Sequence, residues 1–153
     1  MQGIPYATYG FGSQCAIVEV DINTGLVRVI KIIAAHDVGK SINVMNIEGQ
    51  IDGGCVMGLG QALLEEILIE EGKIINTNFS DYLIPTSLDV PEIESVIIEK
   101  TEKTGPFGAK GMAECTNIPT MAAISNAICD ATGIRIKKLP IRGEMILKGL
   151  GKL

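Results

Sequence analysis

The chain has 153 residues, enough for one domain with a sizeable core. Hydrophobic residues make up 46% of it but only 4% is aromatic, so the core has to be built from aliphatic side chains and methionine. The net charge of −5, with acids and bases interspersed, argues against a nucleic-acid or anionic-membrane surface. No apolar run could span a bilayer and no signal-peptide pattern is present, so we expect a cytoplasmic protein.

The four cysteines, at positions 15, 55, 115 and 129, are far apart and form no Cys-x-x-Cys pair. That spacing does not indicate zinc or iron–sulfur ligation. Reduced and mostly buried thiols are the expectation for a cytoplasmic protein.

The first part of the chain predicts a β-hairpin. Residues 11–20 and 26–34 are rich in Val and Ile, and the turn-forming residues 21–25 separate them. Arg28 and Lys31 fall out of strict alternation, so assigning each side chain of this segment to one face of a regular strand is expected to fail at one of them. Next come His36 and Asp37, a pair that could be catalytic, although a structural or exposed turn at a strand end is favoured.

The segment 44–68 is the longest helical candidate, with Ser41 or Asn43 as its N-cap. Gln50, Gly54, Gly58 and Gln61 share one face of this helix. Each interior glycine costs about 1 kcal/mol relative to alanine, so something must pack close to this backbone. Either a second helix or a flat cofactor would suffice, and from spacing alone helix packing is favoured. Glu65 and Glu66 are expected to end the helix on its solvent side.

Further along the chain, residues 67–75 predict a second hairpin and residues 76–91 an irregular stretch. Tyr82 within that stretch is interpreted as a packed side chain more readily than as a substrate contact. Residues 94–100 predict a strand.

After the strand, Pro119 begins a helix that Gly133 ends, and a short strand at 134–139 and a last helix at 142–150 follow. The predicted fold class is α+β: one compact unit, residues 1–153, with strands in hairpins packed against two main helices.

The stretch Gly105-Pro-Phe-Gly-Ala-Lys-Gly-Met-Ala-Glu114 lies between the predicted strand and helix. Its glycines permit a positive φ or a close approach to a ligand, and it ends in a single carboxylate. A glycine-rich loop between two rigid elements is a common support for one catalytic group. A tight turn with a solvated glutamate is the alternative.

This stretch resembles the C-terminal active-site loop of the molybdenum hydroxylases, the xanthine dehydrogenase and aldehyde oxidoreductase family. Two further blocks resemble the same family in the same order, and the resemblance covers about residues 9–147. The blocks are Ala35-His-Asp-Val-Gly-Lys-Ser-Ile-Asn43 and Gly49-Gln-Ile-Asp-Gly-Gly-Cys-Val-Met-Gly-Leu-Gly-Gln-Ala-Leu-Leu-Glu-Glu66.

The resemblance implies a role for particular residues. Glu114 matches the family's general base, and Gln50 matches a glutamine that lies against the molybdopterin. Lys110 and Gly111 fall near the molybdenum end of the cofactor, and no residue is implied as a protein ligand of the metal. The implied reaction inserts an oxygen atom from water into a C–H bond, while the carboxylate takes up a proton.

The resemblance also implies partners, because it extends only over the last part of the molybdopterin-binding subunit. The rest of that subunit would share the molybdenum–molybdopterin cofactor, and iron–sulfur clusters and FAD would lie on other domains or subunits. We expect a fragment, an expressed domain or a small subunit that is inactive alone and forms an oligomer.

The implied substrate is a purine or a related heterocycle, as in xanthine dehydrogenase. Aldehydes, nicotinate-type heterocycles and carbon monoxide are alternatives, and so is a non-catalytic remnant or interaction domain. The intact Gly105–Glu114 block and Gln50 favour the enzyme.

Overall fold

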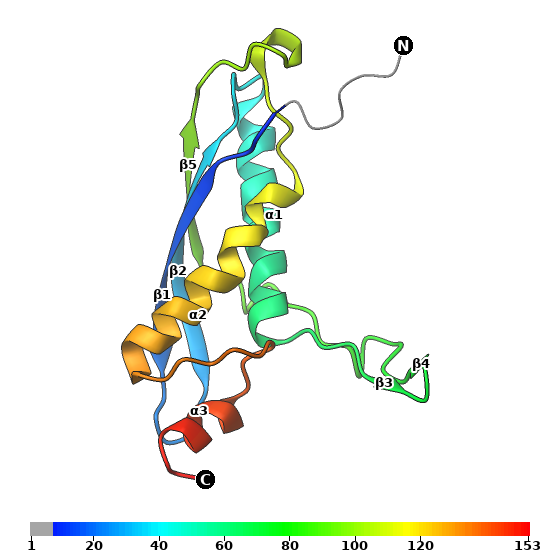
Figure 1. Cartoon of the computed structure of the whole chain (residues 1–153), viewed down its shortest axis with the longest axis vertical. Coiled ribbons are helices and arrows are strands. Elements are labelled where there is room, and N and C mark those ends of the chain that lie inside the picture. Colours follow the sequence, from blue (N-terminus) through cyan, green and yellow to red (C-terminus); the bar gives the residue numbers. More distant parts are fainter. Residues whose placement is uncertain (1–7) are drawn as a thin grey trace.

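The two aliphatic segments at the start of the chain pair as the predicted antiparallel hairpin. They form strands β1 (Gly12–Val20) and β2 (Val27–Asp37) of the computed structural model, which describes residues 8–153 (Figure 1). The pairing register shifts between Ile17 and Val18, so β2 contains one extra residue there. The bulge, which was not predicted, explains why Arg28 and Lys31 do not fit one alternation: the side chains on either side of it follow different phases.

A third strand, β5 (Glu92–Ile98), pairs with β2 in parallel and gives the sheet order β1-β2-β5. It begins before the predicted strand at 94–100. The expectation that His36 and Asp37 lie in a turn was wrong, because β2 continues through both of them. His36 pairs with Gly12 of β1, and Asp37 pairs with Ile98 of β5.

Three α-helices follow from the predicted caps and breakers. Helix α1 (Val44–Leu63) has Asn43 as its N-cap, which accepts a hydrogen bond from the Asn46 amide. Helix α2 (Ile118–Thr132) ends at Gly133, which has a φ of 76°, as predicted. Helix α3 (Gly143–Gly149) is the last helix. The strand predicted at 134–139 was wrong: that segment is a loop.

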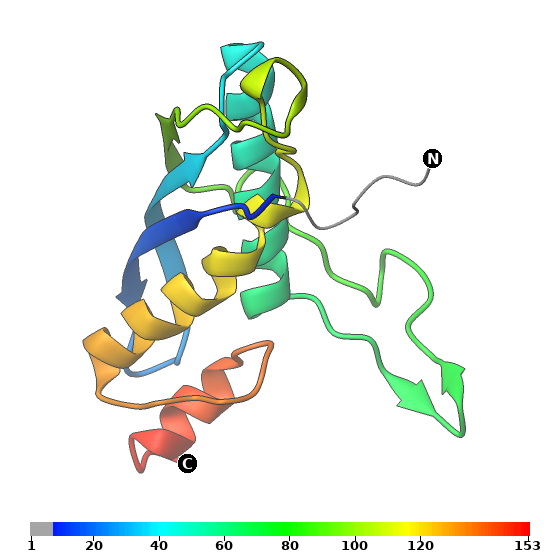
Figure 2. The ribbon, with the colours of Figure 1, turned by 45° about the horizontal axis from the view of Figure 1, so that its top comes forward.

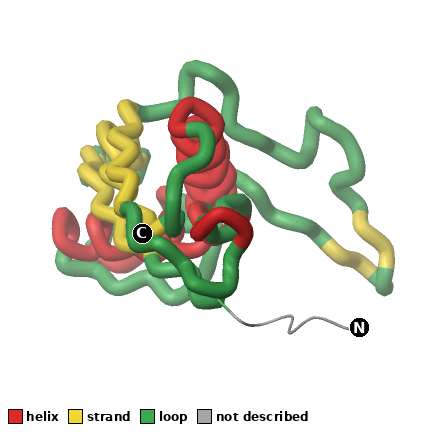
Figure 3. The backbone as a smooth tube through the Cα atoms, turned by 90° about the horizontal axis from the view of Figure 1, so that it is seen from above, coloured by secondary structure: helices red, strands yellow, loops and turns green. Residues whose placement is uncertain are grey.

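Helices α1 and α2 lie side by side over one face of the sheet, so the unit is an α+β layer pair (Figures 1 and 3). Helix α1 contributes a stripe of buried residues at helical spacing, Ile51, Cys55, Leu59 and Ala62. They pack in one cluster with buried aliphatic residues of β2 and α2. Burying each large aliphatic side chain stabilises the fold by about 1.5–3 kcal/mol. The prediction of an aliphatic core is confirmed.

The glycine-bearing face of α1 serves the contact between helices. A Cβ on Gly54 would overlap the side chain of Thr116, and a Cβ on Gly58 would lie 2.5 Å from the Cβ of Thr120. The favoured helix-packing interpretation therefore holds for these two glycines. Gly49 and Gly53, on another face, have open space where a side chain would stand.

Helix α1 ends at Leu63, earlier than predicted, so Glu65 and Glu66 are not solvated residues of its last turn. Both are half-buried and bonded. Glu65 accepts a hydrogen bond of 2.6 Å from the Tyr82 hydroxyl, and Glu66 forms an ion pair of 3.1 Å with Arg142. These contacts hold the base of the segment that follows the helix.

That segment is an arm that projects from the body, as Figure 2 shows. Its tip is the predicted second hairpin, β3 (Ile69–Glu70) and β4 (Lys73–Ile74), with Glu71 and Gly72 at positive φ in the turn. The arm and the loop that returns from it carry exposed large apolar side chains, namely Ile67, Leu68, Ile69, Ile74, Ile75, Phe79, Leu83, Ile84 and Leu88. Such an apolar surface is unusual on a monomer.

All four cysteines are free, but the expectation that most are buried was wrong. Only Cys55 is buried, whereas Cys15 is exposed on β1 and the other two are half-buried. Within residues 8–153, no helix is long and apolar enough to cross a membrane.

Candidate active-site loop

The predicted loop, Gly105–Glu114, lies across the end of β2 and is bonded through the backbone to the residues that directly follow this strand. The Lys40 amide donates to the carbonyl of Gly108 (2.8 Å), and the Lys110 amide donates to the carbonyl of Val38 (2.9 Å). Gly108 has a φ of 82°, a conformation that favours glycine and that turns the loop back towards the strand. Backbone pairing thus fixes the middle of the loop.

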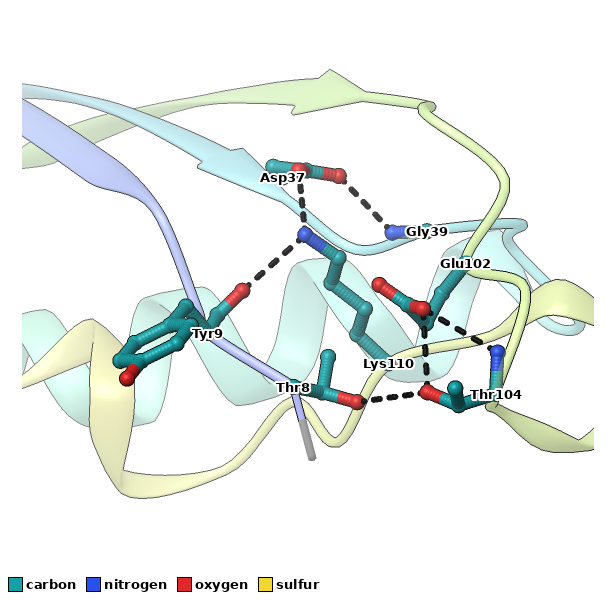
Figure 4. A network of polar contacts seen from close by, with 7 residues as sticks. All are labelled: Thr8, Tyr9, Asp37, Gly39, Glu102, Thr104 and Lys110. Atoms are coloured by element: carbon teal, nitrogen blue, oxygen red, sulfur yellow. Dashed lines mark hydrogen bonds and ion pairs between the residues drawn. The ribbon is translucent and has the colours of Figure 1, made fainter. Parts of the chain in front are cut away.

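A buried ion pair fixes the loop a second time. The Lys110 Nζ lies 2.6 Å from Asp37 Oδ2, and the two side chains are only 6% and 9% exposed. The ammonium also donates to the Tyr9 carbonyl (3.0 Å) and lies 5.1 Å from the centroid of the Phe11 ring. Figure 4 shows the contacts of Lys110 with Asp37 and Tyr9. The hydrogen bond from Lys110 holds the pKa of Asp37 below its ordinary value.

The segment that leads into the loop is held by hydrogen bonds between its own residues and by a contact with Thr8 near the N-terminus. Glu102 accepts hydrogen bonds from the amide (3.1 Å) and the hydroxyl (3.0 Å) of Thr104, also drawn in Figure 4. These bonds lower the pKa of Glu102. The Thr104 hydroxyl lies 3.3 Å from the hydroxyl of Thr8.

The end of the loop contacts α1. It forms one turn of 3₁₀-helix, η2 (Glu114–Thr116), and the Thr116 hydroxyl donates to the carbonyl of Gln50 (3.2 Å). Glu114 itself is exposed, as is Gln50. The fold therefore brings together two predicted site residues that are 64 positions apart in the sequence.

A groove of about 210 Å³ lies between the loop and the start of α1. It is lined by polar and apolar residues: Ile42, Asn43, Asn46, Ile47 and Gln50 on the side of α1, and Val38, Lys40, Ala109, Lys110 and Met112 on the other. Of the predicted site residues, Gln50 and Lys110 thus share one groove. Gly111 and Glu114 do not line it, although they neighbour Met112 in the chain.

A larger cavity, about 580 Å³, lies at the other end of α1, around Leu59 and Leu63. None of the predicted site residues lines it. Among residues 8–153, no group of three or more His, Cys, Asp or Glu side chains is placed to hold a metal ion.

Sequence reasoning missed a polar cluster beneath the loop. Gln14 of β1 donates to the carbonyl of Thr116 (2.7 Å), accepts from the Thr120 hydroxyl (2.6 Å) and lies 3.0 Å from His36 Nε2. Burial lowers the pKa of His36, so its neutral ring accepts from the Gln14 amide. The available signal was a glutamine on the inward-facing side of an otherwise aliphatic strand. His36 thus belongs to the fold's interior, within β2, and not to the predicted turn.

Comparisons with known proteins agree with these features. Residues 1–91 match the molybdopterin cofactor-binding domain family. The chain is 40% identical over 133 residues to the xanthine dehydrogenase molybdenum-binding subunit of Escherichia coli O157:H7, covering 86% of this chain and 18% of that one.

Two solved structures have the same fold over nearly all of the chain. They are the aldehyde oxidoreductase of Desulfovibrio desulfuricans (TM-score 0.87, 38% identity, 97% of this chain and 16% of that one) and quinoline 2-oxidoreductase of Pseudomonas putida (TM-score 0.83, 39% identity, 90% and 18%). The chain thus spans less than a fifth of the length of these relatives. It belongs to the molybdopterin cofactor-binding domain family of the molybdenum hydroxylases, the family of xanthine dehydrogenase and aldehyde oxidoreductase.

Proposed function

We propose that this chain forms one wall of the active site of a molybdenum hydroxylase, with Glu114 as the general base. The observation that carries the proposal is the junction at Thr116, whose hydroxyl bonds the turn that bears Glu114 to the helix residue Gln50. The implied base and the implied cofactor contact are thereby held on neighbouring elements, and Gln50 lines the groove.

The groove suits one edge of a pterin. A pterin ring presents both hydrogen-bond donors and acceptors, and the amide side chains of Asn46 and Gln50 offer both kinds of group. Gly111 is exposed, with open space where a side chain would stand, so its backbone can approach a ligand closely. At about 210 Å³ the groove is too small to enclose the whole cofactor, and we propose that the rest of the subunit covers the other side.

Lys110 has a narrower role in this proposal than the resemblance implied. Its ammonium is bonded to Asp37 and Tyr9, and its amide to Val38. Only the apolar part of its side chain remains to line the groove. We therefore assign the cofactor contacts to Gln50 and Gly111, and to Lys110 a contact through its stem together with the anchoring of the loop.

The bound cofactor would supply the two-electron oxidation in which water provides the oxygen atom. The chain's own contribution is to accept a proton at the carboxylate of Glu114. Among residues 8–153, no ion pair or side-chain hydrogen bond involves this carboxylate. It is therefore free to accept a proton, whereas Asp37 in the same region is held ionised by Lys110.

We propose a purine or a related nitrogen heterocycle as the substrate. Two of the relatives named above, a xanthine dehydrogenase and a quinoline oxidoreductase, carry the names of such compounds. The aldehyde oxidoreductase, equally similar in fold, makes an aldehyde the alternative substrate class. A panel of purines, quinolines and aldehydes assayed with an artificial electron acceptor would separate these classes.

We also propose that the 153 residues form a single domain, the C-terminal segment of the molybdopterin-binding subunit, in a cytoplasmic oligomer. The arm supports this proposal, because its exposed apolar side chains include Ile69, Phe79 and Leu88, which is 95% exposed. Packing them against the remainder of the subunit would remove that surface from water. Iron–sulfur clusters and FAD would be carried by further domains or subunits, and the chain alone would be inactive.

The test uses the complex purified from the protein's own cells. We expect close to one molybdenum per complex, and we expect Glu114→Gln to lower kcat at least 100-fold with the molybdenum content unchanged. Glu144→Gln is the matched control, because Glu144 is an exposed carboxylate on α3, far from the loop in Figure 1. Activity of Glu114→Gln within a few-fold of the parent would remove Glu114 from the role of base.

A further inference from the structure

We propose that Thr116 and Gln14 are positioning residues, which fix the Glu114 carboxylate relative to Gln50. The inference rests on the proposed function, because it assumes that Glu114 is the base. It goes beyond that function in assigning the precise placement of the base to the fully buried Thr116 and the half-buried Gln14, neither of which lines the groove.

The first of the two positioning groups is the Thr116 hydroxyl. Thr116 is fully buried, and its Oγ1 lies 2.9 Å from the carbonyl of Ala113 and 3.2 Å from that of Gln50. One hydroxyl proton is shared between the two acceptors. Ala113 directly precedes Glu114, so this single group joins the backbone beside the base to the backbone of α1.

The second positioning group is the side chain of Gln14, which contacts Thr116 from strand β1 of the sheet. Its Nε2 donates to the Thr116 carbonyl at 2.7 Å, and its Oε1 accepts from the Thr120 hydroxyl at 2.6 Å. The Thr120 hydroxyl is also 3.2 Å from the Thr116 carbonyl. The hydroxyl and the carbonyl of Thr116 are therefore both hydrogen-bonded, and their partners lie on β1, α1 and α2.

Glu114 needs such external support because its own segment supplies little. The turn η2 is a single turn of 3₁₀-helix, and the preceding loop contains glycines whose backbone is permissive. A base that is misplaced by about 1 Å can lose about 100-fold in rate. The Thr116 bonds act two residues from Glu114, and Lys110 anchors the loop four residues before it.

The test compares two substitutions of Thr116 in the assembled enzyme. Thr116→Val keeps the shape and removes the hydroxyl, whereas Thr116→Ser keeps the hydroxyl. We expect the valine variant to lower kcat 10- to 100-fold, with KM within threefold and the molybdenum content unchanged. The serine variant should stay within threefold of the parent.

A second readout does not depend on turnover. Hydrogen–deuterium exchange should speed up at least tenfold at the amides of residues 113–117 in Thr116→Val, and should stay unchanged in the β1–β2 hairpin. Gln14→Met, which removes both bonds from the sheet, should have the same local effect. A uniform rise in exchange, or failure of both variants to fold, would assign a purely structural role and overturn the proposal.

A double variant separates this inference from the proposed function. If Thr116 acts through Glu114, adding Thr116→Val to Glu114→Gln should cause no further loss of kcat. A Thr116→Val enzyme with parental kcat and exchange would overturn the positioning role even where Glu114→Gln is inactive. Conversely, an active Glu114→Gln enzyme would refute the base itself, and faster local exchange in Thr116→Val would still show the bonds at the junction.

Discussion

The ion pair between Lys110 and Asp37 gives the sharpest test of how the loop is held. Lys110→Met keeps the length of the stem and removes the ammonium, so the carboxylate of Asp37 loses its charged partner and keeps the hydrogen bond from the Gly39 amide (3.0 Å). Breaking a buried pair costs about 3–5 kcal/mol. The pair lies beside the exposed residues Tyr9 and Phe11, so water can reach the vacated site. We therefore expect a loss of stability near the lower limit, about 3 kcal/mol.

For a chain of this size, about 3 kcal/mol corresponds to a decrease in Tm of roughly 6–12 °C. The assay is thermal and urea unfolding followed by circular dichroism, because the sequence contains no tryptophan. The double variant Lys110→Met with Asp37→Asn carries no buried charge, and it should recover at least half of the lost stability. The reasoning would be refuted if the stability losses of Lys110→Met and Asp37→Asn added in the double variant, or if Lys110→Met alone lost less than about 0.5 kcal/mol.

The pH dependence of the pair has a definite sign. Lys110 lowers the pKa of Asp37 below its ordinary 3.8, so the folded protein holds the carboxylate ionised to a lower pH than the unfolded chain does. The stabilisation is therefore fully present above about pH 3.8 and is lost as the pH falls through the lowered pKa. In Lys110→Met this source of acid sensitivity should be reduced.

Two further predictions concern the packing of α1 and the buried histidine. Gly54→Ala should destabilise the fold by about 1–3 kcal/mol in urea unfolding, because its methyl group would overlap Thr116. Gly53→Ala, on the open side of α1, should stabilise the cofactor-free chain by about 0.5–1 kcal/mol. Equal effects of the two substitutions would refute this account of the packing of α1. Burial lowers the pKa of His36 below 6.5, so the unfolded chain binds a proton at a higher pH than the folded chain does, and the free energy of unfolding should decrease as the pH falls below about 6.5. His36 is the only histidine of the sequence. An unchanged decrease between pH 6.5 and 5 in a His36→Gln variant would contradict this assignment.

The sequence predicted most of the elements because their signals are local. The aliphatic runs and the turn cluster at 21–25 specified the first hairpin, and Asn43, Pro119 and Gly133 specified helix ends that the structure confirms. Element limits were less predictable where tertiary partners decide them. The second strand continues through Asp37 because β1 and β5 offer it partners, and residues 134–139 form no strand because no strand of the described chain pairs with them.

Some features of the candidate site were also predictable from local sequence, and others depended on tertiary contacts. The glycine-rich loop, Glu114 and Gln50 could be identified from their motifs, although their roles stay proposals. Lys110 was expected near the cofactor, yet its charge is bonded to Asp37, a residue that lies 73 positions away in the chain. No local pattern specifies such a partner, because the pair exists only once the loop lies across the end of β2.

The sequence alone thus determined the fold class, the aliphatic core and the family, since each depends on composition, on periodicity or on the order of short motifs. Only the tertiary structure decided that Gly54 faces Thr116 of η2, that Gly58 faces Thr120 of α2, and that Gln14 and Thr116 support the loop. The physical reason is that buried polar groups must find partners, and which partners are within reach depends on how strands and helices from distant parts of the chain pack together.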